Sequence, residues 1–437
     1  MKYVRRAFVL LAAALPAIAW AQDRSQVPED VNQRTARVES KVIAWRRDIH
    51  RNPELGNREF RTSKLVADHL RSLGLEVKTG IAHTGVVAVL RGGKPGPVVA
   101  LRADMDALPV TEETPVPFAS KVKGTYEGKE VGVAHVCGHD GHTAILMGTA
   151  EVLASMRKEL PGTVKFIFQP AEEGPPDGEE GGAAMMVRQG ALENPRPEVI
   201  FGLHLTNGWE VGKIAYRPGP AMASADNLRI VVKGRGTHGA RPWAGVDPIV
   251  VASQIVLALQ TIASRQVDVT REPSVITIGS IHGGNRYNII PDNVEMAGTI
   301  RTYDEAMKRD IHERIRNTAD MIAKSAGATA EVKIESPYKV TMNDEKLTAR
   351  MLPTLRKVAG AENVMLAQKS PAAEDFSFYA ETVPGLFFQI GVTPKGSDPR
   401  KTANNHSPRF YVDESGLLLG VKALTQLTLD YLQANNK

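Results

Sequence analysis

PVVALRADMD, residues 97–106, is an apolar run that ends in polar residues, and TVKFIFQ at 163–169 and EVIFGLHL at 198–205 have the same form. Apolar runs of this length are typical of strands that are buried on both faces of a sheet. Between the first two of these runs, from about residue 141 to 156, apolar residues recur at the spacing of a helix. The alternation predicts an α/β domain whose mixed, largely parallel sheet is flanked by helices.

The same alternation continues on both sides of this stretch. Upstream, apolar positions recur at helical spacing from Val38 to Leu73, and Gly74 is a predicted stop. Downstream, the pattern predicts a helix near 343–359, a strand at 386–392 and a final helix at 415–433. We therefore expect the two ends of the chain to build one domain.

A different order of elements lies between them. The pattern predicts strands at 228–234, 274–284, 293–302 and 329–335, with helices at 247–265 and 304–327. The order β-α-β-β-α-β is that of a ferredoxin-like unit. The simplest organisation is a catalytic domain of residues 22–216 and 337–437 with an inserted lid and dimerisation domain at 217–336.

Residues 1–21 have the form of an export signal. Lys2, Arg5 and Arg6 give a positive start, and an apolar run leads to a small-residue cleavage site at Ala21. We expect cleavage there and a periplasmic or secreted mature protein. The run is short for a bilayer span of about 20 residues, which disfavours a permanent membrane anchor. The paired arginines also resemble a twin-arginine signal, so the export route stays open.

The composition and the missing motifs argue against nucleic-acid binding, an intrachain disulfide and a serine hydrolase. The chain of 437 residues is 42% hydrophobic and 24% charged, as in soluble globular proteins. Loss of the signal lowers its formal charge from +5 to +2, and no basic run remains that would bind nucleic acid. Cys137 is the single cysteine, so no intrachain disulfide forms. The motif G-x-S-x-G is missing, which disfavours a serine hydrolase.

Four short segments concentrate side chains that bind metals, and each follows a predicted strand or turn. They are HVCGHDGH at 135–142, QPAEEG at 169–174, GLHL at 202–205 and NNHSP at 404–408. Thiolate, imidazole and carboxylate groups suit borderline-soft dications. A core histidine, a surface histidine or a solvated acidic loop would explain any one segment alone. Together they supply enough ligands for two metal ions and a general base.

In QPAEEG, two adjacent carboxylates point in different directions. One of them can hold a metal ion while the other takes a proton from the attacking water. This division of roles is what hydrolysis of an amide requires.

These motifs, together with RADMDALPV, GTHGARP, NIIPD, GTIRT and EDFSFY, occur in one order between about Asp48 and Leu418. The sequence resembles the aminoacylase/carboxypeptidase family of dinuclear metallopeptidases. More narrowly, it is similar to the amidohydrolase branch that contains hippurate hydrolases and the plant hydrolases of indoleacetic-acid conjugates. The resemblance implies metal-dependent cleavage of N-acyl-amino acids, by two ions of Zn or Mn, with Co or Ni as alternatives, in a homodimer or higher homo-oligomer.

The resemblance also implies roles for individual residues. The metal ligands are Cys137, His139, Glu173, His204 and His406. Glu172 is the general base, and Asp106 orients a ligand from behind. In the lid, His238 stabilises the oxyanion, often in the site of a dimer partner, Asn288 contacts the substrate and Arg301 binds its free carboxylate. Asp104 has no assigned role.

Some alternatives remain at this point. Trp243 follows GTHGARP where many relatives have histidine, and aromatic bulk there would change the acyl preference. A dipeptidase or carboxypeptidase would use the same machinery. An exported binding protein without catalysis would be expected to have lost site residues, and here the set is complete.

Overall fold

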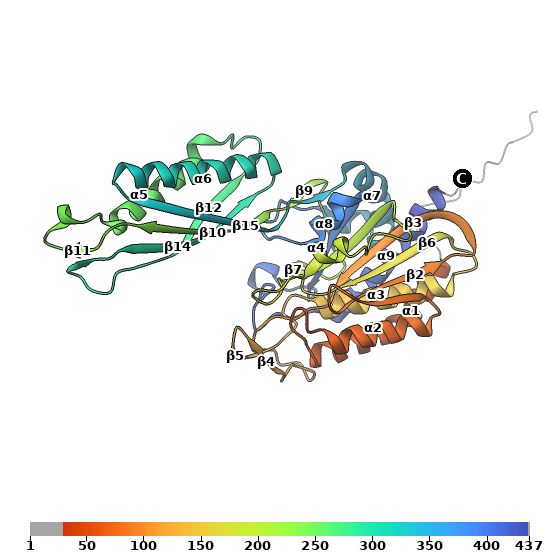
Figure 1. The fold of residues 1–437 in the computed structure, drawn as a ribbon. Helices are drawn as coiled ribbons and strands as arrows, with labels where there is room; N and C mark the ends of the chain where they lie inside the picture. The colour runs from red at the N-terminus through yellow and green to blue at the C-terminus, as the bar shows by residue number, and fades with distance from the viewer. Residues whose placement is uncertain (1–28, 436–437) are drawn as a thin grey trace, which may run out of the picture.

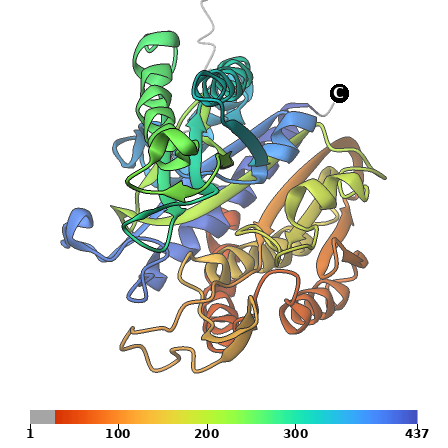
Figure 2. The same cartoon turned by 60° about the vertical axis from the view of Figure 1, so that its left-hand side comes forward.

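A computed structural model describes residues 29–435. The predicted export signal lies outside these described residues. Two sheets dominate the fold, each covered by helices (Figures 1 and 2).

The larger sheet has eight strands in the order β1-β2-β6-β3-β7-β18-β8-β17. Its four central strands, β6, β3, β7 and β18, are parallel, whereas β1 and β2 pair antiparallel at one side. The strands are β1 (Glu76–Ile81), β2 (Gly85–Arg91), β3 (Lys94–Asp104), β6 (Pro161–Gln169), β7 (Val199–Glu210), β8 (Ile214–Tyr216), β17 (Val364–Leu366) and β18 (Gly385–Thr393). These pairings confirm the predicted mixed, largely parallel sheet. The apolar runs at its centre are buried on both faces, as expected of such strands.

Helices pack on both faces of this sheet. Along β3, Val99 and Leu101 face one core and Ala100 faces the other, as the two-residue period of a strand requires. The first core lies under α1 (Glu29–Arg51), α2 (Phe60–Ser72), α3 (His139–Ser155), α7 (Glu345–Ala359) and α9 (Leu417–Ala434). The second lies under α4 (Gly182–Arg188) and α8 (Phe376–Thr382).

The helical pattern predicted from Val38 to Leu73 is two helices, α1 and α2, and the first begins earlier, at Glu29. Pro53 explains the break, because it lacks a backbone N–H and disfavours helical geometry in the residue before it. The loop between the helices turns sharply at Asn57, whose φ is +61°. This loop reaches the functional site described below.

The smaller sheet has the strand order β12-β14-β10-β15, all antiparallel. It consists of β10 (Ser224–Lys233), β12 (Ser274–Gly283), β14 (Asn293–Thr302) and β15 (Thr329–Tyr338), with α5 (Pro248–Thr261) and α6 (Glu305–Ser325) on one face. The chain order β-α-β-β-α-β agrees with the ferredoxin-like prediction. The domain limits predicted at 217 and 336 stay a prediction.

Short two-stranded ribbons complete the described structure. They are β4 (Lys123–Tyr126) with β5 (Lys129–Gly132), β9 (Gly219–Met222) with β16 (Thr341–Asn343), and β11 (Thr237–His238) with β13 (Ile289–Ile290). The β9–β16 ribbon lies where the chain passes between the two sheets. The β11–β13 ribbon lies at the far end of the smaller unit, away from the main sheet (Figure 1).

Candidate metal centre

A cavity of about 1170 Å³ opens at the carboxyl ends of the central strands. Its walls come from β7 and β18, from the loop 171–182 that follows β6, and from the strand ends of the smaller sheet that face it. Open α/β sheets place their ligands at this edge. The predicted metal-binding segments therefore meet at one place although they are far apart in the sequence.

Cys137 and His139 stand at the start of α3, separated by Gly138. His139 Nδ1 lies 2.9 Å from the carbonyl oxygen of Asp106, which can only accept, so Nδ1 carries the ring proton. The Nε2 lone pair is then free. It is buried and has no hydrogen-bond partner among the described residues. A buried ring nitrogen without a partner fits the role of a metal ligand.

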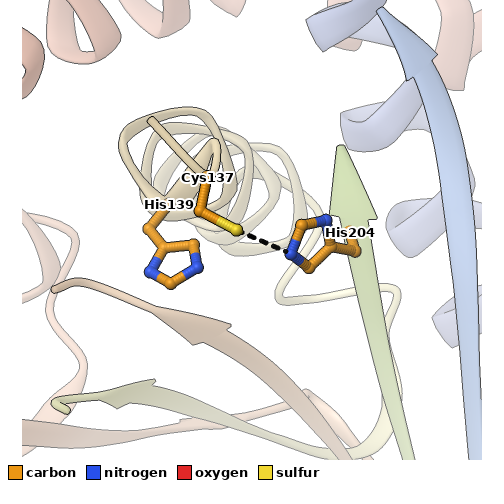
Figure 3. Close-up of side chains that lie close together, drawn as sticks. All are labelled: Cys137, His139 and His204. Atoms are coloured by element: carbon orange, nitrogen blue, oxygen red, sulfur yellow. Dashed lines mark hydrogen bonds between the residues drawn. The ribbon is translucent and has the colours of Figure 1, made fainter. Parts of the chain in front are cut away.

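His204, in the middle of β7, has a similar arrangement. Its Nδ1 lies 2.8 Å from the carbonyl oxygen of Leu205, and its Nε2 lies 3.4 Å from Cys137 Sγ. Figure 3 shows the thiol pointing at this nitrogen, with the His139 ring on its other side. Both imidazoles therefore turn a lone pair toward the thiol.

Glu173 and His406 form the opposite wall. His406 Nε2 lies 2.9 Å from Glu173 Oε1 and 3.2 Å from Cys137 Sγ. Hydrogen bonds to the Cys137 thiol and to Glu173 raise the pKa of His406 to about 10. The loop that carries His406 is held by its backbone N–H, which donates to Val136, and its φ of +70° is rare outside glycine.

The five predicted ligands therefore converge. Cys137, His139 and His204 place their ligand atoms within 4.8 Å of one another, and so do Cys137, Glu173 and His406. Because both sets contain Cys137, its sulfur stands between two ligand groups. Sulfur, imidazole and carboxylate donors at this separation fit a pair of divalent cations.

Glu172, the predicted base, lies beside this cluster. Its side chain is buried, and its Oε2 lies 3.8 Å from His139 Nε2. Burial and the nearby charges of Glu374 and Glu173 raise the pKa of the Glu172 carboxyl well above its usual range. A raised pKa suits a group that takes up a proton and gives it back.

Asp106, predicted to orient a ligand from behind, contacts both His139 and the Glu173 turn. Its Oδ1 is 3.2 Å from His139 Nδ1, and its Oδ2 accepts from the backbone N–H of Glu173 at 3.0 Å. One carboxylate therefore fixes a histidine ring and the turn that carries the two glutamates.

Sequence reasoning gave no role to a buried ionic group next to Glu172. The fully buried guanidinium of Arg102 lies 2.7 Å from Asp104, 3.0 Å from Glu374 and 2.9 Å from Asp375. Burial raises the pKa of Glu374 to about 8, against the opposing charge of Arg102. The motifs RADMDALPV and EDFSFY contain all four residues, and their separation along the chain hid the contact.

Asp104 and His142 form a hydrogen bond with each other, and neither side chain lines the cavity. Asp104 Oδ1 lies 2.6 Å from His142 Nδ1, and His142 Nε2 accepts from the backbone N–H of Leu205 at 2.8 Å. Both ring nitrogens of His142 are thus engaged. This pair holds α3 against β7 and thereby the ligands His139 and His204.

Of the three lid residues that were predicted to act in the site, one lines the cavity and two do not. Arg301 lines the cavity, next to Asn227 and Tyr338. His238 and Asn288 do not line the cavity of their own chain and belong to the outer ribbon region of the lid. Trp243, predicted near the pocket, is 80% exposed in a short helical turn of the lid and does not line the cavity either.

Comparison with known proteins agrees with this arrangement. The family described as peptidase family M20/M25/M40 matches residues 100–430. The chain is 41% identical to thermostable carboxypeptidase 2 of Saccharolobus solfataricus, over 90% of this chain and 96% of that protein. It is 37% identical to the N-acetylcysteine deacetylase of Bacillus subtilis, over 90% of this chain and 97% of that protein.

Among solved structures, the fold is similar to a dinuclear metal-binding M20 peptidase of Bacillus subtilis. The TM-score is 0.75 at 35% identity, and the match covers 91% of this chain and 99% of that protein. The similarity includes both sheets of the described structure.

Proposed function

Since the chain belongs to peptidase family M20/M25/M40, we propose that it cleaves the amide bond of N-acylated amino acids and releases a carboxylic acid and a free amino acid. The protein is a metal-dependent hydrolase with two divalent metal ions. The observation that supports the proposal most is Glu172, a buried carboxylate beside a converged set of ligands. A buried carboxylate with a raised pKa in a cavity beside metal-ligating side chains is typical of a hydrolytic site.

Cys137, His139, Glu173, His204 and His406 would hold the metal ions. Two such ions polarise the scissile carbonyl and lower the pKa of water toward about 7. Thiolate and imidazole donors favour Zn²⁺, and the mixed donor set is also compatible with Mn²⁺, Co²⁺ or Ni²⁺.

Glu172 takes the proton of the attacking water and passes it to the leaving amine. The same carboxyl performs both transfers, which its raised pKa favours. Arg301 in the cavity wall binds the free carboxylate of the amino-acid part through its planar guanidinium.

His238 would stabilise the oxyanion in the cavity of a second copy, since its own chain holds it outside the cavity. Asn288, whose carbonyl accepts from Gly239, would accompany it. We therefore propose a homodimer formed through the lid. Trp243, Leu257 and Tyr287 are exposed apolar side chains of the lid, as expected on a surface that meets a partner.

Glu172→Gln tests the proposed base. We expect the variant to bind two metal ions per chain, by elemental analysis, and to lose most turnover, by roughly 1000-fold. A variant that hydrolyses its substrate at the wild-type rate would refute the assignment.

A substrate panel tests the reaction. The reconstituted enzyme is assayed on acetyl, benzoyl, long-chain and indole N-acyl amino acids, and on dipeptides. The similarity to a carboxypeptidase makes a peptidase the second candidate. Preference for dipeptides over every N-acyl amino acid would favour it.

We also propose that the chain is exported to the periplasm or the medium, with cleavage after Ala21. Amino-terminal sequencing of the protein from the periplasm or medium tests this. We expect it to begin at Gln22.

A further inference from the structure

Ala171, the residue before Glu172, has an unusual backbone conformation. Its φ is +50°, in the left-handed region that residues with a side chain rarely adopt. The Ala171 side chain is buried, and its carbonyl accepts from Gly174, so the turn that carries both glutamates begins there. A conformation of this kind persists only where neighbouring groups hold it.

The carboxyl of Glu59 is the group that holds Ala171 in this conformation. Its Oε1 accepts from the backbone N–H of Ala171 at 2.9 Å and from that of Asn57 at 3.1 Å. Its Oε2 accepts from the hydroxyl of Thr84. Glu59 is fully buried, and although it precedes the first turn of α2, its side chain makes no capping hydrogen bond there. The Glu59 carboxyl therefore accepts hydrogen bonds from Ala171, Asn57 and Thr84 and does not cap α2.

The loop 52–59 fits closely around the same turn. A β-carbon added to Gly56 would lie 3.0 Å from the carbonyl oxygen of Gly174 and 3.2 Å from the β-carbon of Ala171. The loop between α1 and α2 therefore packs directly against the turn that carries Glu172, and this brings Glu59 within hydrogen-bonding distance of Ala171.

We propose that Glu59 is a positioning residue for Glu172, acting through its hydrogen bond to the Ala171 N–H. This inference rests on the proposed role of Glu172. Asp106 holds the other side of the same turn through the N–H of Glu173. The two carboxyls together determine where the Glu172 side chain lies relative to the ligands.

The protonation state of Glu59 does not change this role. Burial and the charge of Asp106 raise the pKa of Glu59 to about 8. When Oε2 carries a proton it donates to Thr84, and Oε1 still accepts both amides. Glutamine reproduces this protonated form, because its carbonyl oxygen accepts and its NH₂ group donates.

Three variants test the proposal in the metal-loaded enzyme. Glu59→Met removes the acceptor with little change in volume, Glu59→Gln keeps it, and Thr84→Val removes only the partner of Oε2. We expect kcat of the methionine variant to fall by about 100-fold, with KM and bound metal unchanged. We expect kcat close to wild type for the glutamine and valine variants.

A crystal structure of the methionine variant gives a readout besides activity. We expect the φ of Ala171 to leave the left-handed region and the Glu172 side chain to move. If Glu59→Met does not fold, Glu59→Asp takes its place, since the shortened side chain cannot reach the Ala171 N–H.

Wild-type kcat in the methionine or aspartate variant would overturn the proposal, as would an unmoved Ala171 or a glutamine variant as impaired as the methionine one. A wild-type protein without metal-dependent amide hydrolysis would refute the proposed function instead. In that case the crystal structure still tests the role of Glu59.

Discussion

Cys137 is the central side chain of the proposed metal centre, because its sulfur lies between the imidazoles of His204 and His406. Cys137→Ala leaves four other ligands, divided between two groups that no longer share an atom. We expect the variant to bind fewer than two metal ions per chain. Elemental analysis after dialysis measures this.

Thermal unfolding provides a second measurement of the same loss. A metal ion at 100 times its Kd stabilises the folded state by about 2.7 kcal/mol. We expect added metal to raise the Tm of the wild type clearly and that of Cys137→Ala much less. The two proteins in chelator should unfold at similar temperatures. An equal rise on metal addition would contradict the assignment of Cys137.

Residues whose role is local in sequence could be predicted, and residues whose role depends on distant contacts could not. Cys137 and His139 lie two positions apart, and Glu172 and Glu173 are adjacent, so the sequence marked them as candidates, and the family resemblance implied their roles. Arg102 looks like an ordinary polar residue in an apolar strand. Its role depends on acidic partners more than 250 positions later in the chain.

At the scale of elements, one buried ion pair joins α6 to the smaller sheet. Asp226 on β10 lies 3.1 Å from Lys308 and 3.0 Å from His312, both on α6. Asp226→Asn leaves the Lys308 charge buried without its partner, which costs about 3–5 kcal/mol. We expect a clear fall in Tm near pH 7. The exposed pair of Asp310 and Arg314 on the same helix offers the control Asp310→Asn, which should change Tm little.

This stabilisation depends on pH with a definite sign. Burial opposes the shift, but the hydrogen bond with His312 and the charge of Lys308 lower the pKa of Asp226 overall. The contribution is therefore complete above the unfolded pKa of about 3.9 and is lost as pH falls through the folded value. The difference in Tm between wild type and Asp226→Asn, in chelator, should shrink as pH falls below the unfolded pKa of about 3.9 and through the lower folded one. If the Tm difference between the two proteins does not change with pH, the charge of Asp226 is not the cause of the stabilisation.

The end of β15 joins the smaller sheet to the Glu172 turn. The hydroxyl of Tyr338 donates to the carbonyl of Glu172 at 2.7 Å. Tyr338→Phe removes one hydrogen bond worth about 1 kcal/mol. We expect kcat to fall by about five-fold with little change in Tm, in a steady-state assay. Tyr411→Phe, at a position that is 41% exposed and outside the proposed site and interface, is the matched control. A loss of the same size in both variants would contradict a specific role for Tyr338.

Long elements could be predicted because their apolar spacing is regular, and short ones could not. The central strands and the β-α-β-β-α-β order follow from runs of buried residues. The two-residue strands β11 and β13 contain too few positions for any period to be visible. The break between α1 and α2 was missed because helical spacing of apolar residues continues on both sides of Pro53.

At the scale of the whole molecule, the two sheets have separate cores, and the chain crosses between them next to the β9–β16 ribbon. Arg301 on β14 lines the cavity, whereas β11, which carries His238, lies at the far end of the smaller unit (Figure 1). A lid movement within one chain would have to carry the far end across the length of the unit. A second copy that contributes His238 requires no such movement.

Mixing two inactive variants separates these possibilities. His238→Ala keeps Glu172 but lacks the oxyanion donor, and Glu172→Gln keeps His238 but lacks the base. If His238 acts in the partner's cavity, a mixed dimer has one complete site, in the chain that carries Glu172. Random exchange of subunits should restore activity to about a quarter of all sites. The variants are co-refolded or co-expressed, and activity is compared with that of each variant treated alone. If His238 acts within its own chain, every site of the mixed dimer lacks one group and no activity returns. Sedimentation of the mixture distinguishes this result from a failure to form dimers.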